Sequence, residues 1–162
     1  MARKRGFERV LERFASSKAG GWYFINVANK VDKHLVPATD GKLSTAVGQQ
    51  VLVVETTGAK SGARRRIPLV YVTDGDAIVL IASKGGAPKN PAWYHNLKAH
   101  PDVRVWAEGR SGSYRAREAD GEERHRLWAK AVDYYAGYDT YQGRTGGRRI
   151  PVMVLERRAS GD

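Results

Sequence analysis

The spacing of apolar residues divides the chain into a helical first part and a strand-rich remainder. Within residues 1–20, apolar side chains recur at helical spacing with Arg and Glu between them, which predicts a basic amphipathic helix. The apolar residues with this spacing are Phe7, Val10, Leu11 and Phe14. A second helical stretch, 22–36, ends before Pro37, and residues 37–48 are typical of a loop.

From Gln50 onwards, short runs rich in β-branched residues predict strands. Six segments carry this pattern: 51–57, 65–74, 76–83, 103–109, 112–118 and 148–156. Asp74 and Gly75 form a hairpin signal between the second and third of these segments. The apolar runs do not alternate cleanly with polar residues, so we expect both faces of the sheet to be covered.

Two helices interrupt the strands. One begins near Pro91, and the other follows Asp120, with Glu123 as capping-box partner, and runs to about Tyr135. Strands joined mostly by hairpins predict an α+β fold, in which a six-stranded antiparallel sheet closes or half closes into a small barrel flanked by helices. No repeat or linker marks a second domain, so we expect 21–162 to form a single domain.

Composition narrows the kinds of chemistry that are open to the chain. It has 162 residues, a formal net charge of +11 and no cysteine, which excludes disulfides and thiol nucleophiles. The charge predicts an anionic partner, which is nucleic acid, an acidic membrane surface or a charged small molecule. The four histidines are not spaced as metal ligands, so we expect no metal site.

The start of the chain leaves two interpretations open. No segment is apolar enough to span a bilayer, and the basic start lacks the apolar core of a signal peptide, so we expect a cytoplasmic protein. The helix in residues 1–20 either packs on its own domain or lies on an anionic membrane. In the second case, residues 1–18 make a peripheral contact at the inner face of the membrane. The sequence leaves the oligomeric state open.

Two basic, glycine-bounded segments are candidate anion sites. The first, "TTGAKSGARRRIP", fails the phosphate-loop pattern because Ala59 separates Gly58 from Lys60, and the alternative is a solvated hairpin tip. The second, "ASKGGAPKNPAW", follows another strand, and its glycines would let backbone amides approach an anion. If the strands pair, Lys60, Arg65 and Lys84 converge on one rim of the barrel.

Aromatic residues suggest a pocket wall. Tyr135, Tyr138 and Tyr141 are three residues apart and could share one face, while polar and glycine residues between them favour a partly open wall over core. The sequence has no hydrolase signature, so the chemistry is expected to come from a cofactor.

Three blocks in this order resemble the deazaflavin-dependent nitroreductase family, F420H2-dependent quinone reductases of the FMN-binding split β-barrel type. The blocks are "VLVVETTGAKSGARRRIPLVYV", "ASKGGAPKNPAWYHNLKAHPDV" and "YYAGYDTYQ…RRIPVMVLE". The resemblance implies coenzyme F420, whose reduced form is a hydride donor and whose tail is polyanionic. The acceptor would be a small, electron-poor molecule such as a quinone, an activated nitro compound or a conjugated enone.

The resemblance also implies a role for particular residues. Lys60, Arg65 and Lys84 would hold the anionic part of the coenzyme, and Tyr135, Tyr138 and Tyr141 would wall the acceptor pocket. The other residues expected to contact the coenzyme are Pro68, Ser83, Gly85, Gly86, Asn90 and Trp93. From the chemistry of these side chains, we expect Tyr138 or Ser83 to donate the proton that follows the hydride, directly or by relay from water. Two rivals are an FMN- or other cofactor-binding barrel without deazaflavin turnover and a nucleic-acid-binding module, which would need a track of cations.

Overall fold

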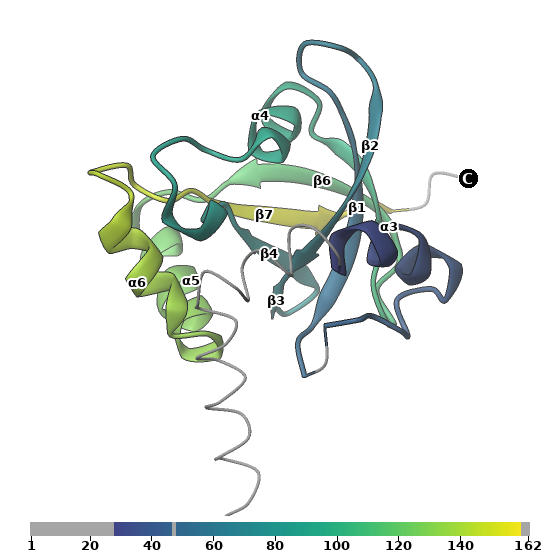
Figure 1. Cartoon of the computed structure of the whole chain (residues 1–162), viewed down its shortest axis with the longest axis horizontal. Helices are drawn as coiled ribbons and strands as arrows, with labels where there is room; N and C mark the ends of the chain where they lie inside the picture. The colour runs from purple at the N-terminus through teal and green to yellow at the C-terminus, as the bar shows by residue number, and fades with distance from the viewer. Residues whose placement is uncertain (1–27, 47, 160–162) are drawn as a thin grey trace, which may run out of the picture.

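The computed structural model describes residues 28–46 and 48–159 (Figure 1). The predicted helix within residues 1–20, with the proposed membrane contact of residues 1–18, lies outside the described residues. The described helices are α3 (Asn29–Ala38), α4 (Ala92–Ala99), α5 (Gly121–Tyr134) and α6 (Gly137–Arg144), together with the 3-10 turn η2 (Lys84–Gly86). Within the described ranges, no helix is long and apolar enough to cross a bilayer.

One curled antiparallel sheet forms the centre of the fold. Its strands are β1 (Val51–Thr57), β2 (Arg64–Val70), β3 (Val72–Asp74), β4 (Ala77–Ile81), β5 (Asp102–Trp106), β6 (Gly112–Glu118) and β7 (Val152–Arg157). They lie in the order β2-β1-β5-β6-β7-β4-β3, and every pairing is antiparallel. The predicted α+β class with an antiparallel sheet is therefore confirmed.

The expectation of six strands is wrong because the predicted strand 65–74 is two strands. Tyr71 separates β2, which pairs with β1, from β3, which pairs with β4 at the other end of the strand order. The chain thus passes from one edge of the sheet to the other within one residue, and this connection requires the sheet to curl. Tyr71 is buried, and the apolar run from Leu69 to Val72 gives no sign of the break.

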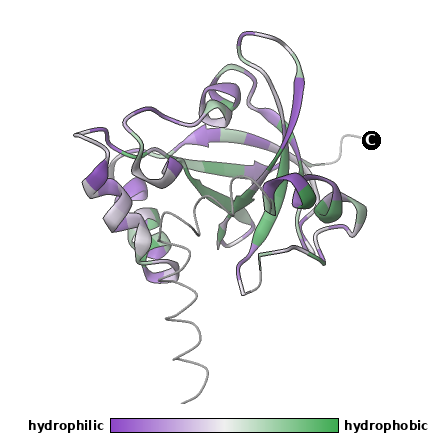
Figure 2. Cartoon of the chain, in the orientation of Figure 1, coloured by the Kyte–Doolittle hydropathy of each residue, from purple (hydrophilic) through white to green (hydrophobic). Residues whose placement is uncertain are grey.

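Both faces of the sheet are covered, as the apolar runs predicted. In β1, Leu52 and Val54 point into the interior of the curled sheet, while Val51 and Val53 pack outside it with Val36 of α3. β4 and β7 alternate in the same way between the interior and a second core beneath α5 and α6. Figure 2 shows the resulting concentration of hydrophobic residues on these strands.

The helix ends differ from the prediction at two points. α3 continues through Pro37 to Ala38, because Pro37 lies in the last turn and the Thr39 hydroxyl and backbone amide both bond to the Leu35 carbonyl. Asp120 is the N-cap of α5 as predicted, but its side chain forms no capping hydrogen bond. Glu123 binds Arg117 of β6 instead, at 2.7 and 2.8 Å, so the predicted capping box is not formed.

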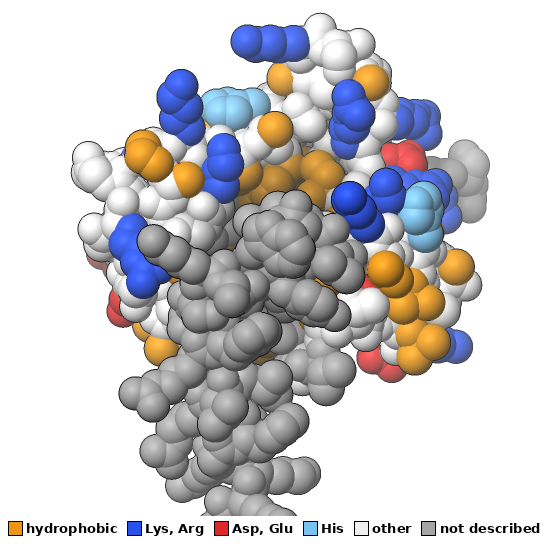
Figure 3. All heavy atoms as spheres, in the orientation of Figure 1, with side chains coloured by type: hydrophobic (Ala, Val, Ile, Leu, Met, Phe, Trp, Pro, Cys, Tyr) orange, Lys and Arg blue, Asp and Glu red, His pale blue; other side chains and the backbone are white. Residues whose placement is uncertain are grey.

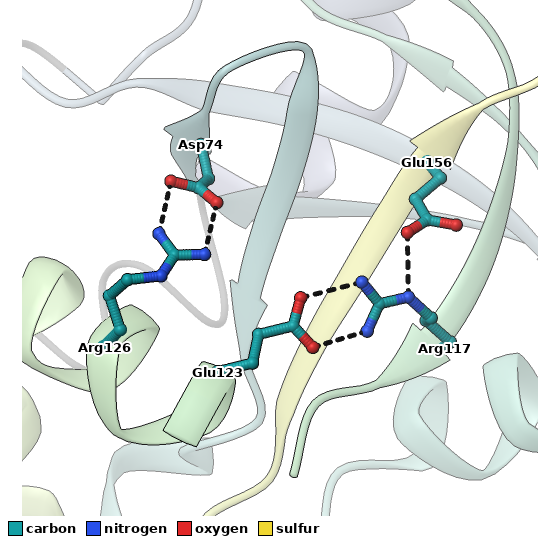
Figure 4. Close-up of polar contacts among 5 residues, drawn as sticks. All are labelled: Asp74, Arg117, Glu123, Arg126 and Glu156. Atoms are coloured by element: carbon teal, nitrogen blue, oxygen red, sulfur yellow. Dashed lines mark hydrogen bonds and ion pairs between the residues drawn. The ribbon is translucent and has the colours of Figure 1, made fainter. Parts of the chain in front are cut away.

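Ion pairs attach α5 to the sheet at two places (Figure 4). Arg117 joins Glu123 of α5 to Glu156 of β7, with the Glu156 contact at 2.8 Å. Arg126 of α5 forms two 2.8 Å hydrogen bonds with Asp74, at the end of β3. The Arg126 hydrogen bonds, with a smaller effect of Lys130, lower the pKa of Asp74 to about 2.

Candidate functional site

A pocket of about 350 Å³ opens between β2, the end of β4, the start of α4, and α6. This volume is within the usual range for a small-molecule site, and most of the lining is apolar. Figure 3 shows hydrophobic side chains near the middle of one face of the molecule, with Lys and Arg side chains at several points around them. The mostly apolar lining suits a largely apolar ligand, and Lys84 among the lining residues suits a ligand that also carries negative charge.

The loop after β4 forms one border of the pocket with an unusual backbone. Lys84, Gly85 and Gly86 have consecutive φ values of 49°, 62° and 85°. Lys84 and Gly85 line the pocket, and their N–H groups form no backbone hydrogen bond within the described part of the chain. The Lys84 side chain is exposed and has no ion-pair partner among those residues. Successive free amides beside a cation are an anion-binding arrangement.

The three arginines of β2 differ in what they contact. Arg64 and Arg66 bind the same carboxylate, that of Glu55, at 2.9 and 3.0 Å. Arg65 alternates with them and so points to the other face of the strand, the face of Ile67, which lines the pocket. Within the described ranges Arg65 forms no ion pair, so its charge remains available to a ligand.

Lys60 lies exposed in the turn between β1 and β2 and has no ion pair within the described residues. Neither Lys60 nor Arg65 lines the pocket. Their predicted convergence with Lys84 at one rim remains a prediction, although the β1–β2 register places Arg65 opposite Thr56 at the turn end of β2.

Trp93 and Asn96 of α4 act on different parts of the site. The Trp93 ring is buried and lines the pocket, while its contact with a coenzyme remains a prediction. Asn96 was not predicted: its amide donates to the Thr56 hydroxyl at 3.0 Å and its oxygen accepts from the Ala59 backbone amide at 3.0 Å. It therefore fixes the start of the turn that carries Lys60. Only the contact across 40 positions identifies it.

Two predicted coenzyme residues, Gly86 and Asn90, lie outside the pocket lining. Gly86 packs against α6, where an added Cβ would lie 2.7 Å from the Tyr141 carbonyl oxygen. The Asn90 side-chain oxygen accepts a hydrogen bond from Arg148, a residue the sequence did not single out. No local signal distinguishes Arg148 from the adjacent Arg149. Pro68 and Ser83, in contrast, do line the pocket.

The three predicted tyrosines all line this pocket. The Tyr135 and Tyr141 hydroxyls lie 3.1 Å apart, and the Tyr138 ring packs edge-on against Tyr135 at 5.2 Å between centroids. Burial raises the pKa of the Tyr138 hydroxyl well above its usual value. That hydroxyl forms no hydrogen bond with the residues the structure describes, so it is available as a neutral donor to a ligand.

Known proteins resemble this chain over most of its described length. The family model described as F420H(2)-dependent quinone reductase matches residues 28–157. An F420H(2)-dependent quinone reductase of Mycobacterium tuberculosis is 44% identical over 110 residues, 66% of this chain and 73% of that protein. A solved structure titled F420-H2 dependent reductase (FDR-A) is 42% identical with a TM-score of 0.58, over 66% of this chain and 94% of that one. Another solved structure, titled a domain-swapped dimer, is 37% identical with a TM-score of 0.62. The match covers 78% of this chain and 97% of that one.

Proposed function

This chain belongs to the F420H(2)-dependent quinone reductase family, and on that premise we propose that it reduces an electron-poor small molecule with reduced coenzyme F420. The enzyme is an oxidoreductase, and a quinone is the first acceptor to test, followed by activated nitro compounds and conjugated enones. We also propose that the curled sheet is a split β-barrel of the FMN-binding type, the finer description of the α+β fold.

The Lys84–Gly86 loop is the observation that carries this proposal. At the border of an apolar pocket that contains Trp93, it presents two amides without a backbone hydrogen bond and an ammonium without an ion pair among the described residues. A flat ring system would fill the apolar part, and a phosphodiester and glutamate tail would meet the cations. The chain's own groups therefore fit a polyanionic deazaflavin.

The rest of the surface favours a small ligand over nucleic acid. On the strands away from the pocket, several arginines are engaged by carboxylates, including the Arg115–Asp102 and Arg117–Glu123 pairs. Lys60, Arg65 and Lys84 form no ion pair with the residues that the structure describes. They lie in the β1–β2 turn, at the start of β2 and in the loop after β4, rather than along a continuous track. Binding of a long single strand needs such a track.

The pocket residues have separate tasks in this reaction. When bound, the reduced coenzyme supplies a hydride to the acceptor. The apolar walls exclude water and orient the acceptor, and Tyr138 donates a hydrogen bond to the acceptor oxygen. Ser83 or Tyr138 supplies or relays the proton, since both line the pocket. Burial raises the pKa of Tyr138 and so makes it a weaker acid than an exposed tyrosine.

Adjacent arginines of β2 provide the test. Arg65→Ala is expected to raise the Kd for coenzyme F420 by about tenfold to a hundredfold, as for loss of a charge-assisted hydrogen bond. Lys60→Ala should act in the same direction. Arg64→Ala removes the same charge from the neighbouring residue. Because Arg64 is bound to Glu55 on the opposite face of the strand, the Kd of this variant for F420 should change by less than about twofold.

Fluorescence titration with coenzyme F420, and separately with flavin mononucleotide, measures these constants. Equal losses in Arg64→Ala and Arg65→Ala would show that only net charge matters. Tight binding of flavin mononucleotide without binding of F420 would contradict the proposed coenzyme and favour the rival cofactor.

A further inference from the structure

Arg148, between α6 and β7, holds the loop that carries Lys84. Its guanidinium forms five hydrogen bonds, which matches the five N–H donors of the group. The acceptors are the backbone carbonyls of Ala82, Ser83 and Ala87 and the Asn90 side chain. None of them is a carboxylate, so these contacts do not neutralise the charge of Arg148.

The acceptors of Arg148 lie on both sides of the left-handed run, which is the segment Lys84–Gly86 with positive φ. The Ser83 carbonyl, at 2.9 Å, precedes Lys84, and the Ala87 carbonyl, at 2.8 and 3.0 Å, follows Gly86. Because both ends are fixed to one planar group, the run between them keeps a single shape. In that shape Lys84 lines the pocket, and its amide forms no backbone hydrogen bond within the described ranges.

The backbone of Arg148 is held by α6 at the same time. Its carbonyl accepts hydrogen bonds from the Thr145 hydroxyl and the Gln142 amide, both at 2.7 Å. Gly86 of the loop also packs closely against α6. α6 carries Tyr138 and Tyr141, so one residue connects the coenzyme loop to the proposed acceptor wall.

We propose that Arg148 is a positioning residue that couples the two walls of the pocket, so that coenzyme and acceptor strengthen each other's binding. Because Arg148 ties the loop to α6, a ligand that shifts the loop also shifts α6, and the second ligand then meets a wall already in the arrangement that it needs. The identity of the two ligands rests on the proposed function. The mechanical connection does not, since it follows from the hydrogen bonds of Arg148.

Arg148→Met and Arg149→Met form a matched pair for the test. Each removes one positive charge, but Arg149 is exposed and forms no hydrogen bond to the loop. The Kd of oxidised F420, which cannot reduce the acceptor, is measured with and without a saturating quinone. The coupling ratio is the Kd of F420 without quinone divided by the Kd with quinone. For Arg148→Met we expect a Kd about tenfold higher and a coupling ratio close to one. For Arg149→Met both values should stay within about twofold of those of the natural protein.

Thr145→Val separates the coupling from the shape of the loop. Valine has nearly the shape of threonine and removes the hydroxyl that bonds the Arg148 and Gln142 carbonyls, leaving the guanidinium contacts in place. We expect the Kd of F420 alone to stay within about twofold and the coupling ratio to fall at least about twofold. Should Arg148→Met not fold, Arg148→Lys, which keeps the charge but not the planar fork, replaces it in the comparison.

A measurement without any ligand distinguishes failure of this inference from failure of the proposed function. Amide hydrogen exchange at Lys84–Ala87 should be faster in Arg148→Met than in Arg149→Met, because only Arg148→Met loses the guanidinium hydrogen bonds that hold this loop. Equal exchange and equal Kd in the two variants would overturn the role of Arg148. If the natural protein does not bind F420 but amide exchange differs between the two variants as expected, the role of Arg148 in holding the loop is upheld and the proposed coenzyme is wrong.

Discussion

Lys84 holds a backbone conformation that is costly for any residue with a side chain. A left-handed φ of 49° costs a lysine roughly 1–2 kcal/mol, whereas Gly85 and Gly86 adopt positive φ freely. Such outliers persist where the surroundings determine them, and the hydrogen bonds of Arg148 on either side of Lys84 do so here. The cation is thereby kept at the border of the pocket before a ligand arrives.

Tyr138→Phe tests the role of the buried hydroxyl. Because burial raises its pKa, this phenol stays protonated across the ordinary pH range and acts as a hydrogen-bond donor. Removing it should leave the Kd of F420 unchanged and lower kcat/KM for a quinone by about twofold to tenfold, as for one neutral hydrogen bond. The pH profile of kcat should keep its shape.

Tyr134→Phe is the control for this change. The Tyr134 hydroxyl bonds the Gln50 amide at 2.8 Å and does not line the pocket, so turnover should stay near that of the natural protein. A loss of about a hundredfold or more in Tyr138→Phe, with an altered pH profile, would instead identify Tyr138 as the proton donor.

The hairpin of β3 and β4 is attached to α5 by one ion-pair cluster, shown in Figure 4. Asp74→Asn removes the carboxylate that Arg126 and Lys130 share. We expect a Tm about 2–4 °C lower at pH 7, the scale of a surface pair in a domain of this size. Asp76→Asn, in the same turn but without an ion pair among the described residues, should change Tm by less than about 1 °C.

The effect of Asp74 must depend on pH in one direction. Its pKa of about 2 in the folded protein lies below the unfolded value of about 3.9. The carboxylate therefore stabilises the fold above the unfolded pKa, and this contribution is lost as the pH falls through about 2. Thermal unfolding of Asp74→Asn and the natural protein from pH 7 downwards should show the difference in Tm shrinking below about pH 4; a constant difference would contradict the assignment.

Elements with a strong local pattern were predictable, and those fixed by distant contacts were not. The apolar runs and the Asp74-Gly75 turn predict most strand positions because both faces of the sheet are buried. The break between β2 and β3 at Tyr71 has no local signal in the sequence, because it depends on which strands lie at the two edges of the sheet. Glu123 matched a capping box locally, but Arg117 on β6 competes for its carboxylate.

The candidate site shows the same division at the scale of the whole molecule. Glycine and lysine blocks indicated the loop after β4 that lines the pocket, and tyrosine spacing indicated a wall of the pocket. Arg148 and Asn96 could not be found this way, because their partners lie 37 to 66 positions away in the chain. Which of three arginines in β2 is free also required the structure, since only the position of Glu55 decides it.

The net charge of +11 predicts a salt dependence that differs between the two ligands. Raising the ionic strength shortens the Debye length from about 10 Å at 0.1 M to about 3 Å at 1 M. The Kd of polyanionic F420 should therefore rise at least about tenfold over that range, whereas the KM of a neutral quinone should change less than about twofold. The increase in the Kd of F420 with ionic strength should be smaller in Arg65→Ala than in Arg64→Ala. Equal increases in the two variants would show that the anionic part of F420 contacts other residues.

The position of β7 in the sheet has a consequence for how the chain is made. β7 lies between β6 and β4, so it joins the group β2-β1-β5-β6 to the pair β4-β3. A ribosome delivers residues 152–157 after every other described strand, and until then those two groups have no strand between them. The nascent chain therefore waits with its sheet open and with the edges of β4 and β6 that pair with β7 still unpaired, a state in which incompletely folded chains tend to aggregate.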